Sequence, residues 1–211
     1  MIDHFKLVIF DMDGVLVDIK SSWHYVHKKL GVDSSKNFQK YLNKEINYTE
    51  FMRRDIRLWG KCHIDTINRI FDSVPLMTGA KQTVFELRNR GYKRAILSAG
   101  ISLLADKVNR KLKFDYVCAN KLCIDENGFL TGEGVVMVEL LSKEAALNEL
   151  IEFIDISADQ CIAIGDSVFD IPVFKKVGLS IAFNTSNNSV KQAADKIIEI
   201  KDLRAIITLL N

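Results

Sequence analysis

Two aspartates separated by one residue follow directly on a short apolar run near the start of the chain. The run is Leu7–Phe10, and the acids are Asp11 and Asp13, with Gly14 next. Four apolar residues without alternation predict a strand buried on both faces, as in a parallel sheet. Buried acids need their charge compensated, and carboxylate oxygens are ligands that suit Mg²⁺. The pattern therefore predicts a ligand site at the end of this strand, although an ordinary Asp-Gly turn is the alternative.

A later stretch of the chain repeats this arrangement. The apolar run Cys161–Ile164 ends in Gly165 and Asp166, and Asp170 follows four residues later. If a helix begins near Ser167, the two acids flank its first turn and face one site. The alternative interpretation is that they only cap this helix.

Two other places carry groups that suit an anion. The strand-like run Arg94–Leu97 leads into Ser98-Ala99-Gly100, where a hydroxyl and small residues before a helix favour a cradle for phosphate oxygens. A plain turn between strand and helix is the alternative. Lys143 begins a predicted helix, where the helix dipole disfavours a cation. It is either a solvated surface residue or a charge that reaches an anion in the site.

Alternating strand and helix patterns predict how these groups are positioned. Strands are expected at Leu7–Phe10, Arg94–Ser98, Tyr116–Ala119, Cys161–Ile164, Leu179–Phe183 and Lys196–Glu199. Helices are expected at Ala80–Arg90 with Thr78 as N-cap, at Ile101–Leu112, at Ser142–Phe153 with Ser142 as cap, and at Asp202–Leu210. This alternation predicts the α/β class: a three-layer, Rossmann-like core with a parallel sheet covered on both faces.

Two segments interrupt the alternation. Residues 19–75 contain the helical patterns Ser22–Leu30, Ser35–Asn43, Thr49–Leu58 and Ile64–Phe71. We expect them to form a small helical cap domain of residues 18–75, inserted after the first strand of a core domain of residues 1–17 and 76–211. The second segment is Leu122–Val136, where the turn residues Asp125–Gly128 predict a short β-hairpin.

Composition limits the possible partners. The 211 residues are 48% apolar and 27% charged, which is typical of a globular protein with its own core. The formal net charge of +2 is too small to indicate nucleic-acid binding. The four cysteines show no CxxC spacing, and no apolar run is long enough to cross a membrane. We expect a cytoplasmic protein, monomer or homodimer, without nucleic-acid or membrane partners.

Taken together, the four motifs resemble those of the haloacid dehalogenase-like hydrolases. They occur in order as Asp11-Met12-Asp13-Gly14, Ser98, Lys143 and Gly165–Asp170. The helical insertion after the first motif and the hairpin around Gly128–Gly132 are similar to those of the phosphoserine phosphatase branch of this superfamily. The resemblance covers the whole chain.

The resemblance implies a Mg²⁺-dependent phosphatase that acts on a small phosphorylated metabolite. Asp11 would attack phosphorus and form an aspartyl-phosphate, and Asp13 would protonate the leaving oxygen and then activate water. Mg²⁺ would be held by Asp11, the backbone carbonyl of Asp13 and Asp166. The transferring oxygens would be stabilised by Ser98, Lys143 and the backbone around Met12, Ala99 and Gly100. Asp170 would orient Lys143 or a metal-bound water.

The insertion departs from the phosphoserine phosphatase branch at two positions. Lys20 stands where that branch has an acid for the substrate ammonium, and Asp55 stands where it has an arginine for the carboxylate. We therefore expect phosphoserine to be a poor substrate. The substrate-binding residues expected here are Lys20, Arg53 and Phe169, with Trp23, His24 and Arg57 nearby, a set that suits a second anionic group, an aromatic ring or a sugar.

Other activities of the same superfamily stay open at this stage. A phosphotransferase would pass the phosphoryl group to an acceptor other than water. A dehalogenase would use Asp11 without a metal, which the acids Asp13 and Asp166 argue against. A phosphonatase would need a lysine from the insertion, a role for which Lys20 is conceivable. A non-catalytic protein that binds phosphorylated metabolites is the remaining alternative.

Overall fold

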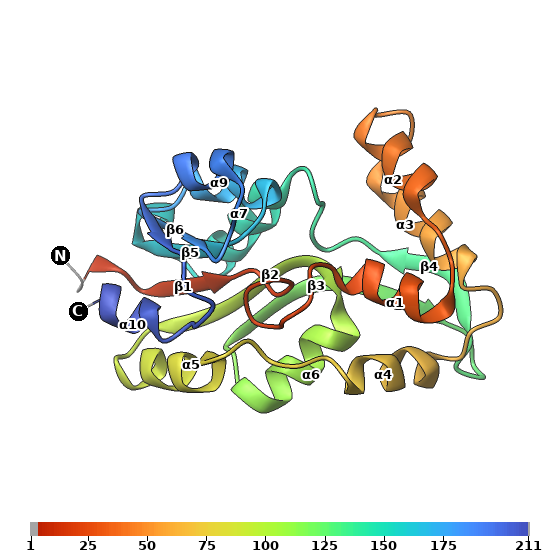
Figure 1. Cartoon of the computed structure of the whole chain (residues 1–211), viewed down its shortest axis with the longest axis horizontal. Coiled ribbons are helices and arrows are strands. Elements are labelled where there is room, and N and C mark those ends of the chain that lie inside the picture. Colours follow the sequence, from red (N-terminus) through yellow and green to blue (C-terminus); the bar gives the residue numbers. More distant parts are fainter. Residues whose placement is uncertain (1–3, 211) are drawn as a thin grey trace.

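The computed structural model describes residues 4–210. Within this range, seven strands form a single sheet in the order β4-β3-β2-β1-β5-β6-β7 (Figure 1). Neighbouring strands are parallel except for β3 and β4, which are antiparallel. The strands are β1 (Leu7–Phe10), β2 (Lys93–Ile101), β3 (Tyr116–Ile124), β4 (Leu130–Val135), β5 (Cys161–Gly165), β6 (Leu179–Phe183) and β7 (Lys196–Ile198). The predicted α/β class and the hairpin are confirmed.

Helices cover both faces of the sheet, as Figure 1 shows. Strand β1 is buried along its whole length, with Val8 and Phe10 in one apolar cluster and Leu7 and Ile9 in the other. The first cluster includes residues of α5 (Ala80–Asn89), α6 (Ser102–Leu112) and α10 (Ala205–Leu209), and the second includes residues of α7 (Lys143–Phe153), α8 (Ile171–Phe174) and α9 (Asn188–Ala193). The result is the expected arrangement of three layers.

The register of the central strands aligns the ends that carry the motifs. Phe10 of β1 pairs with Ile96 of β2 on one side and with Ile164 of β5 on the other. The ladder continues one residue further, because the Asp11 N–H donates to the carbonyl of Ile164 at 2.9 Å. The side chains that follow these three strands therefore meet at one edge of the sheet.

Four helices lie between β1 and α5: α1 (Ser22–Leu30), α2 (Ser35–Leu42), α3 (Tyr48–Leu58) and α4 (Ile64–Asp72). In Figure 1, α2 and α3 project away from the sheet, whereas α4 lies in the layer of α5 and α6. A bridge between Val17 and Leu76 joins the two ends of the insertion. The helices are those predicted, whereas the division into a cap domain of 18–75 and a core domain stays a prediction. Residues 1–3 and 211 of the predicted core lie outside the described residues.

Two local predictions were wrong, and a third was right in position only. The N-cap of α5 is Gly79 rather than Thr78, with a φ of 77° that favours glycine. Ser142 occupies the N-cap position of α7, but its hydroxyl donates to Glu144 instead of accepting from the helix backbone. Strand β2 continues through Ser98-Ala99-Gly100 to Ile101, so these residues lie within the strand and not in a turn before a helix.

Candidate active site

Asp11 lies immediately after β1, where its carboxylate is almost completely buried. One oxygen accepts a hydrogen bond from the backbone N–H of Met12 at 2.7 Å, and the other accepts one from Lys143 Nζ at 2.8 Å. The Met12 N–H, expected to contact the substrate, is thus used by Asp11. Burial, reinforced by Asp170 and opposed by Lys143, raises the pKa of Asp11 to about 7.

Lys143 is the first residue of α7, and only 2% of it is exposed. Its ammonium donates to Asp11 at 2.8 Å and to Asp170 at 2.7 Å. Burial alone would lower the pKa of Lys143, but the charges of the two aspartates hold it above its ordinary value. The interpretation of Lys143 as a solvated surface residue is therefore wrong.

Asp170 fixes both Lys143 and the loop after β5. Its second oxygen accepts hydrogen bonds from the backbone N–H groups of Asp166 and Ser167 and from the Ser167 hydroxyl, at 2.9–3.1 Å. This loop begins a short 3₁₀ helix at Val168–Asp170, close to the predicted helix start. Both oxygen atoms of the Asp170 carboxylate thus hold groups of this chain, Lys143 on one side and the loop at Asp166 on the other.

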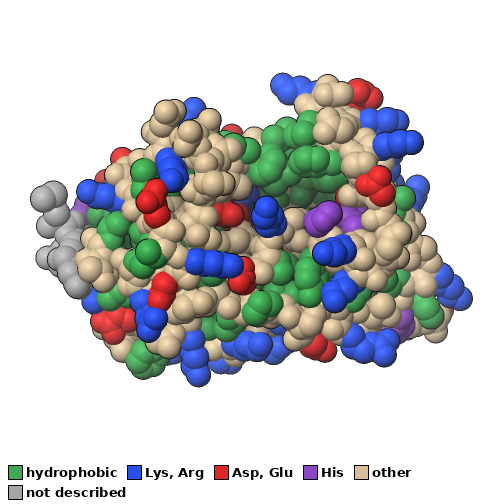
Figure 2. Space-filling view, in the orientation of Figure 1, with side chains coloured by type: hydrophobic (Ala, Val, Ile, Leu, Met, Phe, Trp, Pro, Cys, Tyr) green, Lys and Arg blue, Asp and Glu red, His purple; other side chains and the backbone are tan. Residues whose placement is uncertain are grey.

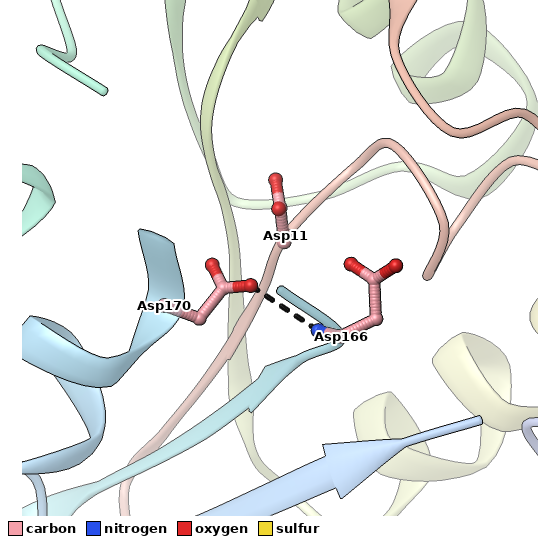
Figure 3. A group of neighbouring side chains, drawn as sticks. All are labelled: Asp11, Asp166 and Asp170. Atoms are coloured by element: carbon pink, nitrogen blue, oxygen red, sulfur yellow. Dashed lines mark hydrogen bonds between the residues drawn. The ribbon is translucent and has the colours of Figure 1, made fainter. Parts of the chain in front are cut away.

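Asp166 faces the same site, and Figure 3 shows its carboxylate beside those of Asp11 and Asp170. One oxygen from each of the three lies within 4.8 Å of the others. Burial and the charges of its neighbours raise the pKa of Asp166 to about 8. Gly14, with a φ of 79°, passes so close that a Cβ there would overlap the Asp166 carboxylate.

This cluster suits a hard divalent cation. Among residues 4–210, no hydrogen-bond donor contacts the Asp166 carboxylate, and burial, with neighbouring aspartates, raises the pKa values of Asp11 and Asp166. Carboxylate oxygens in small number are the ligands that Mg²⁺ takes from proteins. The side chain of Asp13 is not part of this cluster, which fits the predicted use of its backbone carbonyl.

The side chain of Asp13 points instead toward the insertion. One oxygen accepts hydrogen bonds from the backbone N–H and the hydroxyl of Ser22, both at 2.7 Å. The other oxygen is buried and has no partner in the described part of the chain. Burial, opposed by Ser22, raises the pKa of Asp13. A carboxyl group with one open oxygen and a raised pKa can carry a proton to or from a reacting atom.

Strand β2 brings Ser98, Ala99 and Gly100 next to these acids. Ser98 is 2% exposed, and its hydroxyl oxygen accepts from the Gly100 N–H at 3.1 Å. The carbonyl of Ala99 accepts three hydrogen bonds at 2.9–3.1 Å, from Trp23 Nε1, the Tyr48 hydroxyl and Asn120 Nδ2. Two of these donors belong to the insertion, so they attach it to the strand that carries Ser98.

A cavity of about 490 Å³ connects the acid cluster to the insertion. Its walls include the predicted residues Asp11, Asp13, Ser98, Ala99, Gly100, Lys143, Asp166, Lys20, Trp23, His24 and Phe169. Figure 2 shows apolar side chains gathered along the left side of the projection that α2 and α3 form, with histidine below them. Met12 is fully buried and is not among the lining residues.

Arg53 does not contact this cavity, contrary to the prediction. Its guanidinium forms ion pairs with Glu50 and Glu133, both at 2.8 Å. Arg57 also pairs with Glu133, at 2.9 Å. These arginines join α3 to β4 on the outer surface. The periodicity of a helix shows which residues share a face, but not which face meets the substrate cavity.

Asp55 does line the cavity, in a chain of buried polar groups. His27 Nε2 lies 3.0 Å from one carboxylate oxygen, and Asn37 Nδ2 donates to the other at 2.9 Å. Trp59 Nε1 donates to His27 Nδ1 at 2.9 Å. Sequence reasoning missed His27, Ser22, Tyr48 and Asn120, although Asn120 carried a signal as a polar residue directly after the predicted strand Tyr116–Ala119.

The comparisons with known proteins agree with this geometry. The sequence model of the haloacid dehalogenase-like hydrolases matches residues 5–178. The chain is 34% identical over 208 residues to a phosphoserine phosphatase of Methanocaldococcus jannaschii, covering 96% of each, and 29% identical over 210 residues to one of Lactococcus lactis, covering 95% of this chain and 93% of that protein. A solved structure described as a phospho-aspartyl intermediate analogue of phosphoserine phosphatase superposes with a TM-score of 0.82 at 30% identity, over 98% of this chain and 99% of that one.

The chain therefore belongs to the haloacid dehalogenase-like hydrolases. Within them it is similar to the phosphoserine phosphatases, which confirms the resemblance found in the sequence. No helix in residues 4–210 is long and apolar enough to span a lipid bilayer.

Proposed function

We propose that this protein is a Mg²⁺-dependent phosphatase that hydrolyses a small phosphomonoester through an aspartyl-phosphate on Asp11. The observation that carries the proposal is the position of the Asp11 carboxylate, held between Lys143 and the Met12 N–H at the base of a cavity. The relatives named phosphoserine phosphatases, and the phospho-aspartyl analogue solved for one of them, support the same chemistry.

In the first half-reaction, an Asp11 oxygen attacks phosphorus and the bond to the leaving oxygen breaks. Asp13 donates its proton to that oxygen, a role that its raised pKa and open oxygen favour. In the second half-reaction, water attacks phosphorus, Asp13 takes a proton from this water, and the bond between phosphorus and the Asp11 oxygen breaks, which releases inorganic phosphate and restores the Asp11 carboxylate. Two easier displacements thus replace one difficult displacement.

The charge of the transferring oxygens is met by groups that the fold has already oriented. Lys143 supplies a buried ammonium that Asp170 holds in place. The Ser98 hydroxyl can donate a hydrogen bond to a phosphoryl oxygen. Its oxygen already accepts a hydrogen bond from the Gly100 N–H, and its proton remains for another acceptor. Groups fixed before the reaction stabilise developing charge without reorganising.

Asp11 and Asp166 would hold Mg²⁺, together with the backbone carbonyl of Asp13. Bound there, the ion would supply charge neutralisation for a dianionic phosphoryl group and a carboxylate nucleophile. The clustering of the carboxylates and their raised pKa values support this assignment.

The substrate is proposed to be a small phosphorylated metabolite, because the cavity is lined by the insertion and holds about 490 Å³. Phosphoserine is the reference compound, since the relatives are named for it. We propose a cytoplasmic location and a monomer or homodimer. A phosphotransferase would differ only in the acceptor of the second half-reaction.

The test is hydrolysis of p-nitrophenyl phosphate by the purified chain after exhaustive chelation with EDTA, with and without added Mg²⁺. We expect turnover only when Mg²⁺ is present, with release of inorganic phosphate equal to nitrophenol. Full activity without metal would contradict the proposal and favour dehalogenase-type chemistry. Nitrophenol without an equal amount of phosphate would indicate transfer to another acceptor.

A further inference from the structure

The inference concerns the charge state of the groups around Asp55 in the insertion. Trp59 Nε1 is a donor only, and it donates to His27 Nδ1 at 2.9 Å. Nδ1 must therefore carry a lone pair, which places the single ring proton on Nε2, facing Asp55. His27 is the neutral tautomer, and it contributes a hydrogen bond to Asp55 but no positive charge.

The negative charge of Asp55 consequently lacks a balancing cation. Its other partner, Asn37, is also neutral. Across residues 4–210, no lysine or arginine forms an ion pair with this carboxylate, and only 1% of Asp55 is exposed. A charge that is removed from water acts strongly on whatever enters the cavity, because solvent screens it little.

Aromatic side chains form part of the cavity wall. Trp23, Phe38, Tyr48 and Phe51 come from the insertion and Phe169 from the loop after β5, and they lie beside polar residues of the insertion that include Ser21, Asp33, Ser34 and Ser35. Trp23 is held in place by its hydrogen bond to the Ala99 carbonyl and by stacking on Trp59. Such walls favour an apolar or aromatic body over a small zwitterion.

Lys20 is the cationic side chain of the insertion that lines the cavity, but it lies at the exposed rim. Solvent screens an exposed charge, so Lys20 acts on a substrate more weakly than the buried Asp55 does. The buried negative charge therefore dominates recognition of the leaving group.

We propose that Asp55 selects the substrate of this phosphatase. The cavity takes phosphomonoesters whose leaving group carries an amine or hydroxyl donor on an apolar or aromatic body, and it rejects leaving groups that carry a carboxylate. This inference rests on the proposed function, whose active centre supplies the reaction.

The test uses two sets of compounds in which the members differ by one group. Phosphoethanolamine and phosphoserine differ only by a carboxylate, and so do tyramine phosphate and phosphotyrosine. In 4-ethylphenyl phosphate, a hydrogen atom replaces the ammonium group of tyramine phosphate. Each compound is measured as a substrate, by kcat/KM, and as a competitive inhibitor of p-nitrophenyl phosphate hydrolysis, so that binding is reported even without turnover.

We expect each carboxylate-free compound to exceed its carboxylate partner by about tenfold or more, and tyramine phosphate to exceed 4-ethylphenyl phosphate by about threefold. In Asp55→Asn both preferences should shrink to within about threefold, since the amide keeps hydrogen-bonding capacity but loses the charge. Asp65→Asn is the matched control, because Asp65 is exposed on α4 away from the cavity, and it should keep the wild-type preferences.

A wild-type lead for phosphoserine or phosphotyrosine, or equal values within each pair, would overturn the inference even if Asp55→Asn fails to fold. Preferences that persist unchanged in a folded Asp55→Asn would overturn it as well. Hydrolysis of p-nitrophenyl phosphate would continue in either case, so these outcomes leave the proposed function standing. Absence of all Mg²⁺-dependent hydrolysis would instead contradict the proposed function itself.

Discussion

Two buried aspartates line the same cavity, Asp11 from the sheet edge and Asp55 from the insertion, and their partners differ in kind. Asp11 shares the ammonium of Lys143 with Asp170, whereas Asp55 is held by the neutral groups of His27 and Asn37. At the sheet edge, Asp11 and Asp170 surround the ammonium of Lys143, and together with Asp166 they form a cluster that could also hold a metal ion. In the insertion, the Asp55 carboxylate lines the cavity with only neutral hydrogen-bond partners.

On our proposals, this difference separates the residues that carry out the reaction from the residue that selects the substrate. Charge that is balanced by a fixed lysine and a metal ion can act on a phosphoryl group, since the groups are oriented before the substrate arrives. Charge that is left uncompensated discriminates among substrates by attraction and repulsion. Substitutions at Asp11 and at Asp55 should therefore change different kinetic quantities.

The largest expected effect is at the sheet edge. Asp11→Asn should lower kcat for p-nitrophenyl phosphate by more than about 100-fold, because an amide cannot replace a carboxylate nucleophile. The melting temperature should not fall sharply, since the amide oxygen can still accept a hydrogen bond from Lys143. A variant that keeps more than about one hundredth of the wild-type rate, after purification from a host free of wild-type protein, would rule out the nucleophile assignment.

Removing the cation that balances Asp11 should affect both activity and stability. Lys143→Met preserves much of the side-chain volume but leaves Asp11 and Asp170 without their shared partner. Loss of one member of a buried ion pair typically costs about 3–5 kcal/mol in the free energy of unfolding, measurable by urea titration. A loss below about 1 kcal/mol would indicate that the aspartates take up protons or another partner at little cost.

The acid cluster should also make stability depend on pH and metal. The pKa values of Asp11 and Asp166, about 7 and about 8 in the folded chain, exceed the value of 3.8 expected for an unfolded aspartate. The folded state then binds more protons than the unfolded state between these pKa values, so the stability that these two groups contribute is fully present below a pH of 3.8 and is lost as the pH rises toward 7 to 8. Without metal, the free energy of unfolding should fall by up to about 1.4 kcal/mol per pH unit for each such group.

Thermal melts at pH 6 and pH 8.5, with EDTA or with Mg²⁺, measure this effect. We expect the EDTA sample to lose several degrees at the higher pH, and Mg²⁺ to stabilise the protein more at pH 8.5 than at pH 6. Asp166→Asn is the comparison variant, because its melting temperature should depend less on pH and less on Mg²⁺ than that of the wild type. Equal Mg²⁺ stabilisation of Asp166→Asn and wild type would exclude Asp166 as a ligand.

The smallest effect is expected on the outer face of the insertion. Arg53→Gln removes ion pairs with Glu50 and Glu133 that are partly exposed, so the unfolding free energy should change by less than about 1 kcal/mol. Because Arg53 does not line the cavity, kcat/KM should stay within about twofold of wild type. Arg57→Gln is the matched variant on the same helix. A large loss of kcat/KM in Arg53→Gln alone would restore its predicted contact with substrate.

The acids at the sheet edge could be predicted from the sequence, because the end of a buried strand fixes where the next side chain lies. Once Leu7–Phe10 and Cys161–Ile164 were recognised as buried parallel strands, Asp11 and Asp166 had to lie at one edge. The position of the Lys143 side chain could not be predicted in the same way, since a lysine at a helix start is usually solvated. Only the packing of α7 shows that this side chain is buried.

The insertion could not be predicted to the same depth. Its helices were located by their periodicity, but which residues face the cavity depends on how α1 and α3 are tilted. Arg53 and Asp55 are two residues apart on α3, yet one lies outside the cavity and the other lines it. The partners of Ala99, which come from Trp23, Tyr48 and Asn120, depend on contacts between distant segments that no local pattern encodes.

The central claim, that Asp11 carries the phosphoryl group, can be tested directly by trapping the intermediate. The wild-type chain is mixed with p-nitrophenyl phosphate and Mg²⁺, quenched in acid within the first turnovers, reduced with borohydride and digested for mass spectrometry. Borohydride converts an aspartyl-phosphate to homoserine, so we expect homoserine at position 11, none at position 13, and none without Mg²⁺. An unmodified Asp11 alongside burst release of nitrophenol, or modification of another residue, would contradict the account.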